Sequence, residues 1–217
     1  MALTNAQIER YSRQIIVAGV GGRAQERLLA ARVALVAAPA DASSAVAYLA
    51  GAGVGHIVMH PVGDGAPYPA LVERIGDLNP DVSVEIASDE MPEQCDLMLA
   101  LFGDAPAAEA AARVTREYGR GAAIVARLDT PGRIALLPAP PPCPLCAEVD
   151  LLSPPRERAG NAGAIAMVAV TEAFRLLAGL AGQQPEATLI EFDGYASRSR
   201  ALHRRGGEAR CACEAAP

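Results

Sequence analysis

The chain has no lysine: all 19 of its strongly basic residues are arginine. A protein without lysine cannot hold a phosphate with an ammonium group or form a Schiff base. A GC-rich genome replaces lysine with arginine by drift, and this would account for the arginines at surface positions. It accounts poorly for a catalytic lysine, because arginine does not release its proton and differs from lysine in reach and shape. The absence therefore excludes chemistry that depends on a lysine amine in this chain.

Tryptophan is also absent and aromatic residues make up 4% of the sequence, so we expect an aliphatic core. The longest apolar run, residues 162–170, is far shorter than the ~20 residues of a membrane-spanning helix. The first residues are polar and lack the apolar segment of a signal peptide, so we interpret the protein as cytoplasmic, with no membrane partner. A net charge of −6 argues against nucleic acid as a partner.

Glycine is missing from the turn where a nucleotide-binding domain needs it. Residues 33–37 are a Val- and Leu-rich run typical of a buried strand, and residues 43–50 are an alanine-rich helical segment. The connection from Ala37 to Ala42 contains no glycine. In a nucleotide-binding turn, glycine lets backbone N–H groups approach phosphate oxygens without a Cβ in the way. The sequence therefore predicts the frame of a nucleotide-binding domain without its phosphate-binding chemistry.

At 217 residues the chain has the length of a single domain, residues 1–217. Strands and helices alternate along it, which predicts an α/β, Rossmann-like fold: a doubly wound, mainly parallel sheet with helices on both faces, plus a C-terminal hairpin and a Cys-rich tail. The expected strands are residues 33–37, 56–60, 82–86, 97–102, 122–128, 133–137, 188–192 and 200–203. The expected helices are residues 7–16, 25–31, 43–50, 70–78, 105–118 and 161–178. Around the sheet we distinguish N-terminal helices (1–31), a Pro/Cys crossover loop (138–160) and an Arg/Cys tail (198–217).

Local signals mark two helix starts. Thr4 and Gln7 have the spacing of a capping box, and Asp104 directly precedes an expected helix as its N-cap. His56 and His60 stand at the two ends of one short strand, about 13 Å apart. That separation is too large for one metal ion, so we interpret both as structural histidines.

Two sequence blocks resemble one known family. The first is residues 9–16 (ERYSRQII), followed by a glycine cluster and residues 25–28; the second is residues 47–57 (AYLAGAGVGHI). The match resumes at residues 78–82, at Asp96 and Leu97, at residues 142–146 and along residues 162–177. On these motifs, and over nearly its whole length, the chain resembles the ThiF/MoeB/HesA family, the bacterial E1-like adenylyltransferases related to ubiquitin-activating enzymes.

The resemblance implies a chemistry whose residues are largely missing here. Members of the family use Mg-ATP to adenylate the C-terminal glycine of a small ubiquitin-like or sulfur-carrier protein. Matched position by position, the family's glycines fall on Ala37, Pro39, Ala40 and Ala42, its ribose-binding aspartate on Pro61, and its Mg²⁺-binding aspartate on Gly103. The lysine position falls on Pro67 or Tyr68. The resemblance thus implies a degenerate pocket in which we do not expect ATP or Mg²⁺ to bind.

One family residue is retained. Arg13 matches an arginine that, in the family's dimers, reaches across to the partner's ATP. A salt bridge that holds the N-terminal helix is the alternative role. An in-trans arginine beside a lost pocket indicates the silent half of a dimer, an arrangement that eukaryotic E1 enzymes use. We therefore predict a homo- or heterodimer with an E1-like chain, and no catalytic residue acting in cis.

The cysteines suggest a zinc site. Cys143 and Cys146 form a C-x₂-C pair where the family has its first zinc pair, and Cys211 and Cys213 form a C-x-C pair in the tail. A thiolate pair on each of two loops makes a closed, structural Cys₄ zinc site. Disulfides, which a reducing cytoplasm disfavours, and a tail with unpaired thiols are the alternatives. Cys95 is expected to be a half-buried thiol of the core.

Three functions fit these observations. The first is a non-catalytic, zinc-stapled, dimeric E1-like subunit that supports adenylation of a ubiquitin-like or sulfur-carrier protein by its partner. The second is an active adenylyltransferase with a rebuilt pocket, for which the available residues include Asp41, Ser43, Ser44, Asp64 and Asp104. The third is an ATP-independent module that holds a peptide or carrier-protein tail at the carboxyl edge of the sheet. Nucleotide binding separates the second function from the other two.

Overall fold

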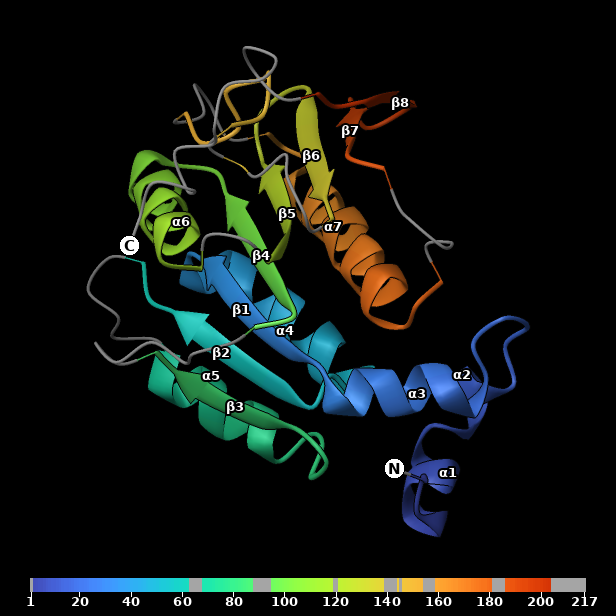
Figure 1. The fold of residues 1–217 in the computed structure, drawn as a ribbon. Coiled ribbons are helices and arrows are strands. Elements are labelled where there is room, and N and C mark those ends of the chain that lie inside the picture. The colour runs from blue at the N-terminus through green and yellow to red at the C-terminus, as the bar shows by residue number, and fades with distance from the viewer. Residues whose placement is uncertain are drawn as a thin grey trace.

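A mixed sheet organises the chain in the computed structural model, which describes residues 2–62, 68–87, 95–118, 121–138, 144, 146–153, 159–180 and 186–203. Its strand order is β3-β2-β1-β4-β5-β6-β7-β8 (Figure 1). β1 to β5 run parallel, and β6, β7 and β8 are antiparallel to their neighbours. The strands are β1 (Arg32–Ala37), β2 (His56–His60), β3 (Ser83–Ile86), β4 (Leu97–Phe102), β5 (Ala122–Arg127), β6 (Gly132–Leu137), β7 (Thr188–Phe192) and β8 (Ser197–Ala201). The predicted Rossmann-like sheet with a C-terminal hairpin is confirmed.

Helices cover both faces of the sheet. The helices are α1 (Asn5–Arg10), α2 (Ser12–Ile15), α3 (Gly21–Ala30), α4 (Pro39–Gly51), α5 (Tyr68–Gly76), α6 (Ala105–Tyr118) and α7 (Ala162–Leu177). One face packs against α3, α4, α5 and α7, and the opposite face packs against α6 and the segment 146–153. Side chains alternate between the two faces along β1, so this strand contributes to both cores. Leu35 and Ala37 face the first core, and Ala34 and Val36 face the second.

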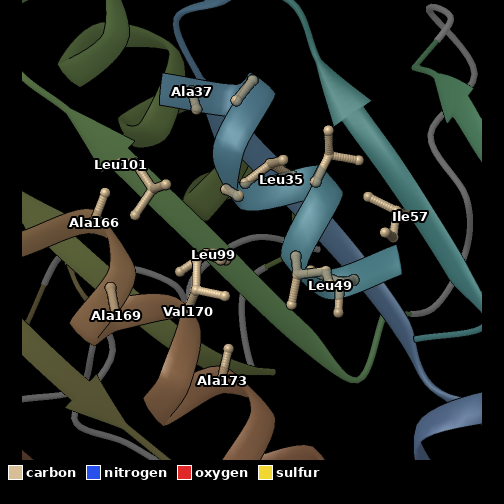
Figure 2. Close-up of a cluster of buried hydrophobic side chains, with 14 of the residues drawn as sticks. Leu35, Ala37, Leu49, Ile57, Leu99, Leu101, Ala166, Ala169, Val170 and Ala173 are labelled. Atoms are coloured by element: carbon tan, nitrogen blue, oxygen red, sulfur yellow. The ribbon is translucent and has the colours of Figure 1, made fainter. Parts of the chain in front are cut away.

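The larger core lies between the sheet, α4 and α7. Figure 2 shows Leu35, Leu99 and Leu101 of the sheet beside the side chains of α4 and α7. β4 is buried along its full length, as expected for a central parallel strand. Small residues on α7, such as Ala166 and Ala169, allow the helix to approach the sheet closely. Each fully buried leucine contributes about 1.5–3 kcal/mol to folding.

The family-like block at residues 47–57 has a physical explanation. A Cβ at Gly55 would lie 1.9 Å from the carbonyl oxygen of Leu29, so only glycine allows the end of α3 to touch the start of β2. Gly53 has a φ of +84°, and a Cβ there would meet Tyr11 and Gln25. These two glycines therefore dock the N-terminal helices against the sheet.

Several element boundaries differ from the sequence-based expectation: α3, for example, begins at Gly21 rather than at residue 25, and α5 spans Tyr68–Gly76 rather than residues 70–78. Three further differences have an identifiable cause. The helix predicted over residues 7–16 is split into α1 and α2 at Tyr11, which is buried and whose hydroxyl bonds with Asn79 and Asp81. The predicted capping box at Thr4 is confirmed. α4 begins at Pro39 rather than residue 43, because proline suits the first position of a helix. β8 begins at Ser197 rather than residue 200, because Asp193 accepts the N–H groups of Tyr195 and Ala196 and closes a tight turn.

A candidate nucleotide site at the carboxyl edge of the sheet

The parallel strands β1, β2, β4 and β5 all end at one edge, here called the carboxyl edge. Strand order reverses between β1 and β4, where the chain continues to β2 on one side and to β5 on the other. In doubly wound folds this reversal creates the crevice in which nucleotides bind. The start of α4, the end of β2, Tyr68 and the start of α6 surround this position.

Two of the first-turn positions of α4, Pro39 and Asp41, offer no free N–H to a phosphate. Pro39 occupies its first turn and has no N–H. The N–H groups of Asp41 and Ala42 both donate to the carbonyl oxygen of Ala38, at 2.9 and 2.8 Å. Of these first helical residues, only Ala40 retains an N–H that could point at a ligand. A phosphate-binding helix start normally offers several such groups together.

Asp41 adds a second obstacle at the same place. It lies in the first turn of α4 and is 5% exposed. A carboxylate there interacts favourably with the positive end of the helix dipole. An acidic side chain is thus buried at the same helix end that a phosphate would use.

Tyr68 closes the space between the ends of β1 and β2. Its side chain is 1% exposed, and its hydroxyl donates to the carbonyl oxygen of Ala37 at 2.6 Å and accepts the N–H of Val62 at 3.0 Å. Burial raises the pKa of Tyr68 above its ordinary value, and the nearby charges of Asp104 and Asp41 act in the same direction. In nucleotide-binding Rossmann domains, the ribose is held by an acidic residue at the end of the second strand. Here an aromatic side chain joins the two strand ends instead.

Two of the predicted site positions lie at the carboxyl edge, directly after β2 and β4. Pro61 follows directly after β2 and Gly103 directly after β4. Asp104 accepts the N–H of Ala107 at 2.9 Å, which confirms its predicted role as the N-cap of α6. Gly63, Asp64 and Pro67 lie outside the described residues.

His60 is a buried ionisable group at this edge. It is 1% exposed, and burial lowers its pKa to about 4, with the positive charge of Arg113 adding to the shift. His56, at the other end of β2, is exposed, and its Nδ1 lies 2.9 Å from the hydroxyl oxygen of Ser83. His60 is therefore neutral at pH 7.

A buried ionic cluster at the end of β5 was not anticipated from the sequence. Arg127 and Arg133 both donate to Oδ2 of Asp129, at 2.6 and 3.3 Å, and Arg127 also donates to the hydroxyl of Ser153 at 2.5 Å. The side chains of Arg127 and Asp129 are 5% and 9% exposed. The period-two pattern of β5 and β6 places Arg127 opposite Arg133, but no sequence pattern shows that Asp129 turns back between them. The cluster ties the β5–β6 turn to the segment 146–153.

Arg13 lies at the other edge of the sheet, where the parallel strands begin. It is exposed on α2, whose Gln14 side chain donates to the carbonyl oxygen of Ala52 at 3.0 Å and to Gln25 at 2.5 Å. Ala52 follows the last turn of α4, whereas the candidate nucleotide site lies at its first turn. The 13 residues of α4 separate the two edges by about 20 Å. An arginine side chain cannot cross that distance, so Arg13 does not reach the pocket of its own chain.

The predicted zinc ligands are only partly within the described residues. Cys146 is half-buried, whereas Cys143, Cys211 and Cys213 lie outside them. Cys95 is half-buried and packs against the second core, as expected. The described ranges hold no group of three or more potential metal ligands, and no described helix is long and apolar enough to cross a membrane.

Comparison with known proteins extends the resemblance. No family model matches the chain. Protein HesA (vegetative) of Trichormus variabilis is 34% identical over 116 residues, 45% of this chain and 44% of HesA. The SAMP-activating enzyme E1 of Haloferax volcanii is 35% identical over 105 residues, 39% of this chain and 38% of that protein. The chain therefore matches less than half the length of each of these relatives.

The fold agrees with this assignment. The crystal structure of Escherichia coli MccB with succinimide has a TM-score of 0.68, covers 94% of this chain and 74% of its own, and is 13% identical in sequence. At that identity the likeness concerns the fold alone. The two sequence relatives and the shared fold together support the resemblance of this chain to the ThiF/MoeB/HesA family of E1-like proteins.

Proposed function

We propose that this chain is a non-catalytic E1-like subunit, which supports a partner chain that adenylates the C-terminus of a ubiquitin-like or sulfur-carrier protein. The observation that carries the proposal is the Tyr68 hydroxyl, which joins Ala37 and Val62 across the ends of β1 and β2. The Pro39 start of α4 and the buried Asp41 support it, because they remove donors and add negative charge where phosphates would bind.

Calorimetric titration of Mg-ATP into the purified chain tests the first part of the proposal. We expect no heat beyond dilution from the chain alone, with the SAMP-activating enzyme E1 of Haloferax volcanii measured in parallel as a comparison. We also expect no ATP–pyrophosphate exchange when the chain is alone with a ubiquitin-like protein. Robust exchange without a partner would show instead that the pocket has been rebuilt and that the chain is an active adenylyltransferase.

The position of Arg13 supports a role in a dimer with an E1-like chain. It is exposed on α2, and the Gln14 contacts hold that helix at the edge opposite the chain's own pocket. In a complex with an active E1-like chain, we expect Arg13→Ala to lower the partner's exchange rate about a hundred-fold, the usual effect of removing one donor to developing charge. Arg23→Ala, another exposed arginine on the neighbouring α3, is the matched control and should leave the rate unchanged. Co-purification without any effect of Arg13→Ala would favour the ATP-independent binding module.

We further propose that Cys143, Cys146, Cys211 and Cys213 hold a structural zinc ion. The segment after Cys146 is bonded to the chain that leads into the tail, because the N–H of Glu148 donates to the carbonyl oxygen of His203 at 2.9 Å and Arg200 pairs with Glu148. A reducing cytoplasm, expected from the sequence, favours thiolates over disulfides. Metal analysis should find equimolar zinc, lost in Cys146→Ser and retained in Cys95→Ser. Zinc-free protein with a disulfide would contradict this assignment.

A further inference from the structure

β8 forms a lateral edge of the sheet, and in the described part of the chain it pairs with β7 alone. The N–H of Leu202 donates to the carbonyl oxygen of Ala187 at 2.7 Å, and Asp193 donates likewise to Ala196 at 3.3 Å. Bonded and non-bonded pairs alternate along an antiparallel ladder. Arg198 and Arg200 therefore turn their backbone groups toward β7, and the intervening small residues Ser197, Ser199 and Ala201 turn theirs away from the sheet.

This outer row of backbone groups is a template for another strand. The described residues supply a partner to one of these groups, the carbonyl oxygen of Ala201, which accepts Nη1 of Arg200 at 3.1 Å. No proline or bulge interrupts β8. Exposed edges of this kind bind extended peptides by adding a strand to the sheet. The Asp193 turn fixes the hairpin before any partner arrives.

A cavity lies on one face of this edge. It has a volume of about 310 Å³ and lies between the second half of α7 and the strands β5 to β8, with Ser199 in its lining. Its apolar lining includes Ile124, Leu136, Leu176 and Ile190. The Glu172–Arg175 ion pair and Glu186 also line it. Ser197, Ser199 and Ala201 project toward this same face, since Ser199 is paired with Ile190. Their small side chains leave room for a large side chain of an adjacent strand to enter the cavity.

The opposite face of β8 is basic. Arg198 and Arg200 project there, with Arg200 paired to Glu148. The guanidinium of Arg198 has no hydrogen bond or ion pair within the described residues, although its charge helps to keep the pKa of Asp193 low, after the two backbone hydrogen bonds of that carboxylate. An acidic side chain placed opposite Arg198 on a new strand would supply the missing charge.

We propose that β8 binds an extended segment of a partner protein as an additional strand, with a large apolar side chain of that segment in the α7 cavity and acidic side chains beside Arg198 and Arg200. A second copy of this chain fits the edge poorly. An antiparallel pairing centred on Ser199 would set Arg198 of one β8 opposite Arg200 of the other, and like charges directly opposite destabilise a ladder. The proposal goes beyond the proposed function and does not depend on nucleotide.

The test uses the full chain and a labelled synthetic peptide, acetylated and amidated, that alternates glutamate with leucine. Fluorescence anisotropy at low salt should show binding, and the same peptide with lysine for glutamate should bind about ten-fold more weakly. N-methylation of the central leucine removes one ladder donor and should also weaken binding about ten-fold. Equal binding of the glutamate and lysine peptides, or no binding of either, would overturn the proposal and leave the arginines as a device against edge pairing.

Two variants probe the edge itself. Ser199→Pro removes an N–H that faces away from β7, so the native ladder is preserved, and it should reduce peptide affinity at least about ten-fold. Ser199→Thr keeps the N–H and should bind like the wild type. Arg198→Glu should reverse the preference between the glutamate and lysine peptides. Unchanged binding by Ser199→Pro, with an unchanged melting temperature, would place the peptide elsewhere and reject the assignment to β8.

Discussion

The Tyr68→Phe substitution probes the contact that closes the candidate pocket. It removes one oxygen atom and keeps the ring, so packing is nearly unchanged. The lost hydroxyl leaves the carbonyl oxygen of Ala37 and the N–H of Val62, both buried, without their partner. A buried polar group that loses its partner costs about 1–3 kcal/mol, so we expect roughly 2–6 kcal/mol from the two groups together.

Urea unfolding followed by circular dichroism measures this cost, and thermal unfolding should show a fall of roughly 4–24 °C for a chain of this length. Tyr48→Phe is the matched control, since Tyr48 is 65% exposed on α4, and its stability should change by less than about 0.5 kcal/mol. The Tyr68→Phe protein should still not bind Mg-ATP, because Pro39 and Asp41 remain. A stability change below about 0.5 kcal/mol, or a gain of nucleotide binding, would refute the description of Tyr68 as a structural closure of the pocket.

Three further substitutions test other parts of the fold. The folded-state pKa of His60, about 4, lies below its ordinary 6.5, so the contribution of neutral His60 to the free energy of unfolding is complete above pH 6.5 and is lost as the pH falls toward 4. Between pH 7 and pH 4 the wild type should therefore lose about 3 kcal/mol more stability than His60→Gln. His56→Gln, the control, should behave like the wild type in urea titrations at both pH values. Gly55→Ala should cost at least about 2 kcal/mol by the same measurement, because its Cβ would overlap the carbonyl group of Leu29, whereas Gly76→Ala, which meets nothing within 4 Å, should be neutral or slightly stabilising. Asp129→Asn should destabilise the protein by about 3–5 kcal/mol, because it leaves the buried Arg127 without its charged partner. Glu85→Gln, in the exposed pair with Arg32, should cost less than about 1 kcal/mol. Equal losses would contradict the buried role of Asp129.

Elements with purely local signals could be predicted closely. β2 and β4 have the predicted bounds, because each is a short apolar run with clear breaks on both sides. The Asp104 and Thr4 caps were predicted because a cap and its N–H partner lie within three residues of each other. The split of the first helix was not predicted, because Tyr11 is held by Asn79 and Asp81, which lie far along the chain.

The candidate site divides in the same way. The absence of its lysine and glycines could be read directly from the sequence, because the presence or absence of a residue type does not depend on the structure. The filling of the crevice could not be predicted, because Tyr68 bonds to Ala37 from 31 residues away. The Arg127–Asp129–Arg133 cluster escaped prediction as well, because nothing in the residue spacing shows which way a side chain in a turn will point.

By itself, then, the sequence determined the alternation of strands and helices, the family resemblance and the absence of lysine and of glycine between Ala37 and Ala42, because each depends on residue type and short-range order. The tertiary structure alone decided that Tyr68 joins β1 to β2, that Asp41 is buried at the start of α4, and that Arg13 lies at the edge opposite its own pocket. It also decided which backbone groups of β8 face outward, since that depends on the register with β7. These features depend on contacts between residues far apart in the chain, and such contacts exist only after the sheet has assembled.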